Sequence, residues 1–226
     1  TKAILIGYPN NPTWTIMDRA SLEKVAAFAK AHDLIVIADE IYCDLTYEGQ
    51  HTCFASLPDM QERTIVLNGF SKSYAMTGLR IGYVCAPREA LEEIYKVHQY
   101  EILCASTTSQ YGAIEALRNC DDDVKAMFEE YAARREMIYQ GLVDMGLTVF
   151  KPKGAFYIFP DISCTGMNEE EFCDRLLTEE KVGVVPGTCF GPQGKNHIRI
   201  SYAASRENIA EALKRMARFV KKYKKA

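Results

Sequence analysis

The sequence predicts an α/β fold: a mixed, mostly parallel sheet with one antiparallel strand, followed by a smaller α+β domain. Three observations support this prediction. Short apolar runs alternate with helical patterns early in the chain, polar clusters follow several of these runs, and the pattern changes beyond one long helix. A length of 226 residues is enough for two domains. We expect them at 1-120 and 121-226, the second domain being entered by the long helix.

The first part of the chain has the pattern strand, helix, strand. Residues 2–6 form an apolar run, and from Asp18, a good helix N-cap, apolar residues recur at three- and four-residue spacing. Residues 34–38 and 64–67 are short continuous apolar runs. Strands buried on both faces have this composition, so we expect a parallel sheet covered by helices.

The next apolar run, residues 81–86, is expected to be antiparallel to its neighbour. Only about a dozen residues separate it from the run at 64–67. Such a connection is marginal for the helical crossover that a parallel pair requires. Residues 88–99 and 107–118 then follow as helices.

The second part of the chain begins with a long helical pattern, residues 121–145, which Gly146 closes. Its first three residues are aspartates, which complement the dipole of a helix at its N-terminus. Beyond it we expect apolar runs at 147–150 and 154–160, a helix at 168–178, short strands at 182–185 and 197–202, and a closing helix at 206–223.

The composition narrows the function classes. A net charge of -3 gives no sign of a nucleic-acid or membrane partner, and no apolar run is long enough to span a bilayer. Eight cysteines are scattered without a Cys-x-x-Cys pair, and four histidines stand singly, so no metal site is expected. Cysteines used in this way are expected to be small buried hydrophobes of a cytoplasmic protein.

One stretch, residues 69–83, carries the chemistry. It holds Lys72 amid small and hydroxyl residues, with Arg80 eight positions later. A desolvated lysine loses its proton and attacks carbonyl carbons. An arginine nearby suits a phosphate, which it holds with two parallel hydrogen bonds. The stretch therefore predicts a Schiff-base lysine and a phosphate-bearing aldehyde cofactor.

Polar side chains follow three predicted strands where each of them ends: Asn11, then Asp39 with Tyr42, then Lys72. Open α/β sheets bind their ligands at the carboxyl edge of the parallel strands. Three clusters at one edge are a stronger indication of a site than any one of them.

Taken together, these motifs resemble the class I and II aminotransferases, fold-type I enzymes that use pyridoxal 5'-phosphate (PLP). The resemblance covers essentially the whole chain, and the wording of residues 68–72 and 75–80 is closest to the aspartate-aminotransferase-like branch. It rests on Asn11-Pro12-Thr13, Asp39-Glu40-Ile41-Tyr42, Ser71-Lys72, residues 77–83, Gly154-Ala155-Phe156-Tyr157 and Ile198-Arg199-Ile200. It implies that 1-120 is part of the PLP-binding large domain and 121-226 the small domain.

The resemblance implies a role for each cofactor-binding side chain. Lys72 would form the Schiff base and shuttle the proton between substrate and cofactor, which makes it the central catalytic group. Asp39 would keep the pyridinium nitrogen of the cofactor protonated. Tyr42, the second catalytic residue, and Asn11 would donate to the phenolic oxygen. Both bonds lower the pKa of the Schiff base.

Phosphate and substrate would be held by two arginines in this resemblance. Arg80, helped by Ser71, would bind the phosphate. Arg199, with Asn11, would bind the α-carboxylate of the substrate as a two-pronged pair. By alternation Arg199 lies on the opposite face of its strand from Ile198 and Ile200.

Two positions depart from the family pattern. Trp14 stands where the family has glycine after Asn-Pro-Thr, and a tryptophan at positive φ brings strain or shifts the turn. Gly69 stands where many relatives have a phosphate-binding serine. The N-terminal half of such enzymes, with its glycine-rich phosphate loop, has no counterpart here. The chain is therefore expected to be the C-terminal portion of a longer, homodimeric protein and to be inactive alone.

Two other functions remain open at this point. A PLP-dependent C–S β-lyase keeps the same lysine, aspartate and arginine, and a transcription regulator can carry an aminotransferase-like domain that senses a ligand. The substrates of an aminotransferase would be an L-amino acid and a 2-oxo acid. The likeness of residues 68–72 and 75–80 to the aspartate-aminotransferase-like branch favours aspartate or a related amino acid with 2-oxoglutarate. Aromatic amino acids and alanine remain open as donors.

Overall fold

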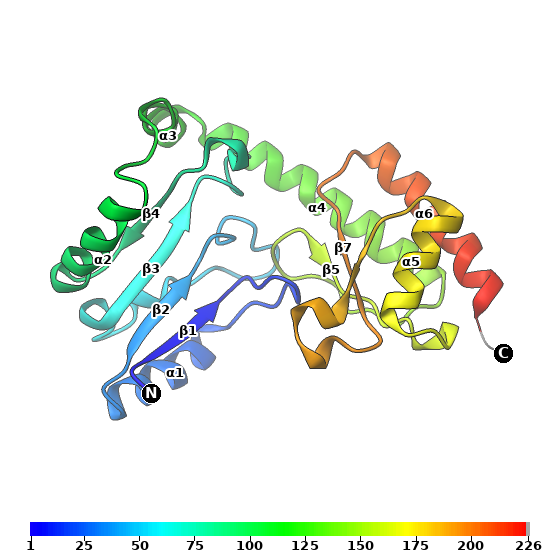
Figure 1. Ribbon diagram of the computed structural model, residues 1–226, viewed down its shortest axis with the longest axis horizontal. Helices are drawn as coiled ribbons and strands as arrows, with labels where there is room; N and C mark the ends of the chain where they lie inside the picture. The colour runs from blue at the N-terminus through cyan, green and yellow to red at the C-terminus, as the bar shows by residue number, and fades with distance from the viewer. Residues whose placement is uncertain (225–226) are drawn as a thin grey trace. The chain divides into compact units, whose positions relative to one another are not determined.

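The computed structural model describes residues 1–224 and divides into two compact units (Figure 1). The first unit comprises Thr1–Asn10 and Thr15–Phe128. The second comprises Asn11–Trp14 and the chain from Glu129 onward. The division falls inside helix α4 (Asp121–Asp144), whereas the sequence-based boundary lies at the start of that helix. Within the described residues, no helix combines the length and the apolar character needed to cross a membrane.

The first unit is built on a four-stranded mixed sheet. Its strands lie side by side in the order of the chain (Figure 1): β1 (Ala3–Gly7), β2 (Ile35–Asp39), β3 (Thr64–Gly69) and β4 (Gly82–Cys85). The pairs β1–β2 and β2–β3 are parallel, and β3–β4 is antiparallel. The predicted mixed sheet is confirmed, and the short β3–β4 connection explains the one antiparallel pair.

Helix α1 (Arg19–Ala31) covers this sheet with its apolar face. The side chain of Asp18 caps it by accepting a 2.7 Å hydrogen bond from the backbone N–H of Ser21, as predicted. The core of the unit combines buried residues of α1 and β2, the residue after β1, and the segment after β2: Leu22, Ala26, Ala29, Val36, Ala38, Tyr8, Phe54 and Met60. Helices α2 (Arg88–Glu101) and α3 (Thr107–Asn119) follow where they were predicted.

The second unit contains a small antiparallel sheet in the order β5–β7–β6. The central strand β7 (Ile198–Ser201) is flanked by β5 (Tyr157–Ile158) and β6 (Val185–Pro186). The two outer strands are shorter than the apolar runs predicted. Single backbone bonds continue the pairing with β7 on both sides of β5, from the N–H of Tyr202 to the Phe156 carbonyl at 3.0 Å and from the N–H of Ile198 to the Pro160 carbonyl at 3.2 Å. The regular ladder is short because Ala155 has a left-handed backbone (φ 56°) and a proline has no N–H to donate. Residues 147–150 contribute only one bridge, between Thr148 and Asp161.

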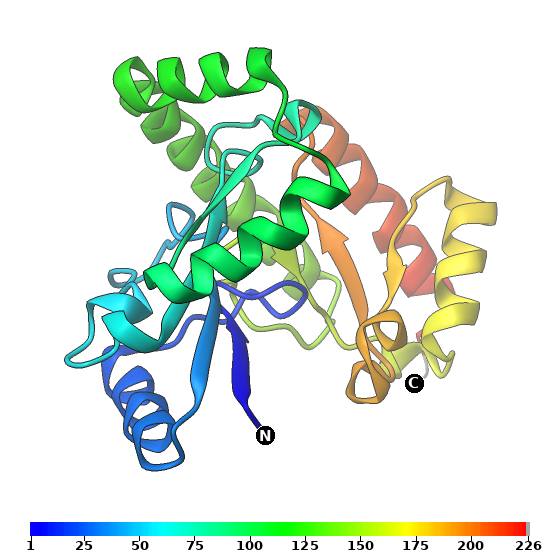
Figure 2. The same cartoon turned by 60° about the vertical axis from the view of Figure 1, so that its left-hand side comes forward.

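Helices α5 (Glu169–Glu180) and α6 (Arg206–Tyr223) lie side by side in the second unit (Figures 1 and 2). Their apolar faces meet through Phe172 and Phe219, whose ring centroids are 5.2 Å apart and nearly perpendicular. An edge-to-face pair of this kind adds about 0.5–1.5 kcal/mol to the burial of both rings. Both helices were predicted, at 168–178 and 206–223.

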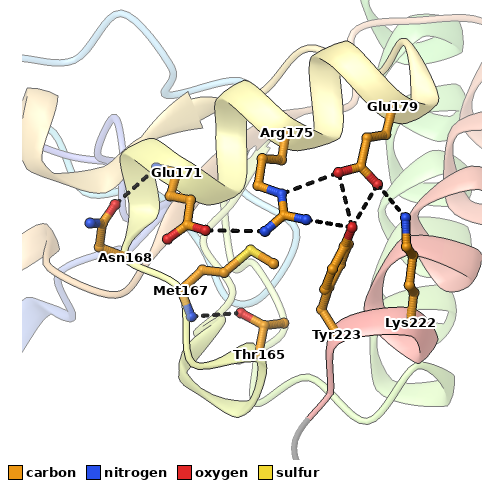
Figure 3. Close-up of polar contacts among 8 residues, drawn as sticks. All are labelled: Thr165, Met167, Asn168, Glu171, Arg175, Glu179, Lys222 and Tyr223. Atoms are coloured by element: carbon orange, nitrogen blue, oxygen red, sulfur yellow. Dashed lines mark hydrogen bonds and ion pairs between the residues drawn. The ribbon is translucent and has the colours of Figure 1, made fainter.

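A polar cluster joins the ends of the same two helices (Figure 3). The carboxylate of Glu179 accepts hydrogen bonds from Lys222 Nζ at 2.9 Å, from the Tyr223 hydroxyl at 2.9 Å and from Arg175 Nε at 3.1 Å. The guanidinium of Arg175 also lies 4.2 Å from the centroid of the Tyr223 ring. These bonds hold the pKa of Glu179 at about 2, with Lys222 the largest cause and Tyr223 the next.

The depressed pKa of Glu179 predicts an acid-dependent stability of the second unit. A carboxylate with a lower pKa in the folded state stabilises the fold fully above its unfolded pKa of about 4.3. That contribution is lost as the pH falls towards about 2. Replacing Glu179 with Gln is therefore expected to lower stability at pH 7 and to leave it little changed near pH 2. Urea unfolding at several pH values measures this.

The matched control is Glu129→Gln, which replaces an exposed glutamate of α4 in the same unit. Its stability is expected to follow the unsubstituted chain across the whole range of pH. Equal effects of the two substitutions would contradict a specific role for the cluster around Glu179.

The cysteines differ from their prediction as buried hydrophobes. All eight are free, and of these only Cys173 is buried. Cys85, Cys104 and Cys189 are exposed, and the other four are half-buried. The prediction was wrong because the scattered spacing of the cysteines does not determine the face on which each side chain lies.

Candidate active site

Asp39 is the last residue of β2 and lies at the carboxyl edge of the parallel strands. It pairs with Gly7 of β1 on one side and with Leu67 of β3 on the other. One carboxylate oxygen, Oδ1, accepts a 3.2 Å hydrogen bond from the backbone N–H of Ile41. The backbone carbonyl of Asp39 accepts another, also 3.2 Å, from the N–H of Tyr8. The carboxylate is thus held at the edge where open α/β sheets bind ligands.

Tyr42 and Lys72 come together from the turns that follow β2 and β3. Tyr42 is buried, and Lys72 is half-buried. The Nζ atom of Lys72 lies 5.9 Å from the centroid of the Tyr42 ring, which places an amine against an aromatic face. The turn that carries Lys72 is closed by its own backbone, because the N–H of Ala75 donates to the Lys72 carbonyl at 3.3 Å. The structure therefore brings together the two side chains that the sequence assigned to catalysis.

Ser71 and Arg80 belong to the same segment of the first unit. Ser71 directly precedes Lys72, and Arg80 ends a short 3-10 helix (Thr77–Leu79) with a left-handed backbone, φ 50°. The Arg80 guanidinium is exposed, and its Nη1 donates to the Thr77 carbonyl at 2.8 Å. A guanidinium has five N–H donors, so this bond leaves donors for a phosphate.

The position three residues before Lys72 is occupied by Gly69, and the structure shows why a serine does not fit there. Gly69 pairs with Gly82 across the β3–β4 ladder. A Cβ atom at Gly69 would lie 2.8 Å from the Cα of Gly82, closer than two such atoms approach. A serine would therefore require the two strands to separate. In this chain Ser71 and Arg80 are the phosphate-binding candidates of the segment.

A second set of predicted site residues meets in the second unit. Arg199 of β7 donates from Nη1 to the Oδ1 atom of Asn11 at 2.8 Å. Its guanidinium lies between two rings, 4.6 Å from the centroid of Tyr157 and 4.5 Å from that of Phe190. Because a guanidinium has no acceptor, the Asn11 atom that faces it must be the oxygen. The NH₂ group of Asn11 is then the part of that amide left to donate elsewhere.

Strand β7 presents Arg199 as its alternation predicts. Ile198 and Ile200 are buried on the other face, and Arg199 is half-buried. Within residues 1–224, the buried Nε atom of Arg199 has no hydrogen-bond partner. A buried guanidinium donor without a partner is unfavourable. A carboxylate is the group that best satisfies such a donor, so this cluster favours an anionic ligand.

Trp14 adopts the left-handed backbone that a glycine would take at this position, with φ 52°. The expected strain is therefore present, and it amounts to about 1–3 kcal/mol for a residue with a side chain. The turn itself is closed at its base, where the N–H of Asn10 donates to the Thr15 carbonyl at 2.9 Å. In the described part of the chain, the buried indole N–H of Trp14 has no hydrogen-bond partner.

Phe190 was not recognised from the sequence, and Tyr157 was assigned no role beyond packing. The register of the small sheet is the feature that indicates contact of Tyr157 with Arg199, because Tyr157 pairs with Ser201 of β7. That register places Tyr157 diagonal to Arg199 on the same face of the sheet. Phe190 lies in the 3-10 helix Gly187–Phe190 outside the strands, and no periodic pattern indicates its direction.

Comparison with known proteins assigns this arrangement to a family. The model of a family described as "Aminotransferase class I and II" matches residues 1–216. The chain belongs to the class I and II aminotransferases. The predicted family and its α/β fold are thereby confirmed.

Relatives within this family include curated and solved proteins. A "Putative aminotransferase YugH" of Bacillus subtilis is 49% identical over 222 residues, covering 98% of this chain and 58% of that protein. An "Aspartate aminotransferase" of Pyrococcus abyssi is 46% identical over 227 residues, covering 99% and 58%. The crystal structure of an aromatic aminotransferase from Pyrococcus horikoshii matches with a TM-score of 0.95 at 44% identity, covering 98% and 60%. The chain thus spans about 58% of the length of these curated relatives.

Proposed function

We propose that the protein to which this chain belongs is a PLP-dependent aminotransferase that transfers an amino group between an L-amino acid and a 2-oxo acid. The observation that carries the proposal is the placement of Lys72 after β3, against the ring of Tyr42, beside the strand that ends in Asp39. An amine, a phenol and a carboxylate at the carboxyl edge of one sheet are the groups that PLP chemistry requires.

The donor set of the first unit fits PLP group by group. Asp39 is an anion for a protonated ring nitrogen, and Ile41 occupies only one of its oxygens. Tyr42 offers a hydroxyl to the phenolic oxygen. Ser71 and Arg80 offer donors to the phosphate, and the Arg80 side chain is exposed. When bound, PLP supplies an aldehyde that links covalently to amines and a ring that accepts electrons.

Each residue then has a task in the transfer reaction. Lys72 would hold the cofactor through its Nζ, and the same amine, once free, would carry the proton to and from the substrate α-carbon. Asp39 holds the proton on the ring nitrogen. Arg199 binds the α-carboxylate between Tyr157 and Phe190, and Asn11 fixes one edge of its guanidinium.

The substrates and the assembly are part of the same proposal. Aspartate or a related amino acid with 2-oxoglutarate is the favoured pair, because one close relative is an aspartate aminotransferase. Another relative is an "Aromatic-amino-acid aminotransferase 2" of Thermococcus litoralis, so aromatic amino acids are included among the donors to be tested. We further propose a cytoplasmic homodimer, with 1-120 in the PLP-binding domain and 121-226 as the small domain.

Borohydride labelling of the longest natural chain that contains this sequence tests the proposal. Reduction of the PLP-loaded protein is expected to fix the cofactor on Lys72, as shown by peptide mapping. Incubation with amino acids and 2-oxoglutarate is expected to yield glutamate and the 2-oxo acid of the donor, without the ammonia or sulfide that a β-lyase releases. A label on another lysine, or no label, would contradict the proposal. The isolated 226-residue chain is expected to bind PLP weakly and to show negligible transamination.

A further inference from the structure

Glu40, the residue after Asp39, is a buried carboxylate with three donors around it. Its side chain is 3% exposed. Oε1 accepts a 2.8 Å hydrogen bond from the backbone N–H of Phe54 and a 3.4 Å bond from the hydroxyl of Tyr8. Oε2 lies 2.7 Å from Nε2 of His51. All four residues belong to the first unit, and together we call them the Glu40 cluster.

The Glu40 cluster is closed by its own members. The Tyr8 ring stacks on the His51 ring, with centroids 5.2 Å apart, and the Tyr8 hydroxyl also lies 3.1 Å from the Thr52 carbonyl. Burial, followed by the charge of Glu40, raises the pKa of Tyr8. Tyr8 therefore remains a protonated donor. Since both oxygens of Glu40 are bonded, the cluster functions as an anchor rather than as a site for another ligand.

The anchor acts on the backbone that carries Asp39 and Tyr42. The N–H of Glu40 donates to the Leu67 carbonyl of β3 at 2.9 Å, and the Glu40 carbonyl accepts from Cys43 at 2.9 Å. Neighbouring side chains at the end of a strand point to opposite faces. The bonds that hold Glu40 on one face therefore set the direction of Asp39 on the other and the start of the turn that contains Tyr42.

We propose that Glu40 is a positioning residue, whose bonds to Phe54, His51 and Tyr8 orient Asp39 and Tyr42 toward the ring of PLP. This inference rests on the proposed function. Removing the carboxylate releases three donors at once. The buried backbone N–H of Phe54 and the His51 ring lose this acceptor, and the Tyr8 hydroxyl keeps the Thr52 carbonyl alone. The freed backbone then lets the two cofactor-binding side chains shift.

Two substitutions at Glu40 separate positioning from charge. Glu40→Ala removes all three bonds. Glu40→Gln keeps an oxygen for Phe54 and Tyr8 and places an amide NH₂ against His51, which accepts that bond as a neutral imidazole. Glu40→Gln is therefore expected to behave like the unsubstituted protein within about threefold in kcat. Glu40→Ala is expected to lose about 10- to 100-fold, as a displacement of about 1 Å does.

The decisive readout is the visible absorbance of the chromophore that Lys72 forms with PLP, titrated with pH in the longest natural chain. Tyr42 would donate to the phenolic oxygen and Asp39 would keep the ring nitrogen protonated. Both the donated bond and the ring proton favour the deprotonated Schiff base, so displacement of the two side chains raises its pKa. Glu40→Ala is expected to raise that pKa by about half a unit to one unit, and Glu40→Gln by less than about 0.2. KM is expected to change less than about twofold, since Arg199 and Asn11 lie outside the Glu40 cluster.

Controls keep the test decisive. Glu62→Ala removes an exposed carboxylate of the same unit and should leave every readout unchanged. If Glu40→Ala does not fold, His51→Ala replaces it, with a shift in the same direction of about 0.2–0.5 units from losing one of three bonds. An unchanged pKa in both variants overturns the inference. Equal losses in Glu40→Ala and Glu40→Gln overturn it as well. Absence of any Lys72 label in the unsubstituted protein overturns the proposed function and this inference with it.

Discussion

Replacing Lys72 with alanine is expected to abolish amino-group transfer by the longest natural chain that contains this sequence. Under the proposed function, the substitution removes both the amine that would bind the cofactor covalently and the base that would move the substrate proton. General acid–base catalysis alone contributes about 10²–10⁴-fold, so a loss of at least about 10⁴-fold in kcat is expected from both functions together. Steady-state glutamate formation and borohydride labelling measure the two functions separately.

Two further variants show that the effect belongs to this amine. Lys72→Arg keeps the positive charge over the Tyr42 ring, but a guanidinium remains protonated and does not attack a carbonyl, so it should be as inactive as Lys72→Ala. Lys24→Ala removes an exposed lysine of α1 and should retain full activity. Activity of Lys72→Ala above about a tenth of the unsubstituted protein would show that another group moves the proton.

The large-scale features of the fold were predictable because they depend on local sequence. The Asp18 cap, the alternation around Arg199 and the short connection before β4 are each determined within a few residues. The outer strands of the small sheet were overestimated. Beside β5, the left-handed backbone of Ala155 and the missing N–H of Pro160 leave single bonds where an apolar run favours a regular ladder.

The contacts that orient the site residues were not predictable in the same way. Lys72 and Asp39 were found because strand ends at a sheet edge follow from topology. The carboxylate of Glu40 is held by residues 32 positions before it and 11 and 14 after it. Arg199 and Asn11 are 188 positions apart. Such pairs have no sequence signature, because a side-chain contact between distant segments depends on the packed structure.

Trp14 and Gly69 depart from the family pattern for different physical reasons. The tryptophan occupies the left-handed backbone conformation, so the turn is kept at the cost of strain. The glycine is required because β4 approaches too closely for a side chain. From the sequence alone, both appear equally as substitutions, and only the backbone angles and distances distinguish strain from steric necessity.

Replacing Arg199 with lysine is expected to raise KM for both the amino acid and the 2-oxo acid. An ammonium keeps the charge but loses the planar edge that binds a carboxylate with two bonds, and it loses the contacts with the Tyr157 and Phe190 rings. One charged hydrogen bond of about 2 kcal/mol and two ring contacts of about 0.5 kcal/mol each total about 3 kcal/mol. This corresponds to roughly a 100-fold loss in kcat/KM.

Phe190→Leu separates orientation of the guanidinium from its charge. It removes one of the two faces between which Arg199 lies and leaves the bond to Asn11 in place. KM should rise about two- to fivefold for both substrates, with kcat unchanged, because the ring contributes equally before and during reaction. The α-carboxylate is the feature that both substrates share, so an effect on only one of them would contradict its assignment to Arg199. Arg19→Lys, on the exposed surface of α1, is the matched control and should change neither constant.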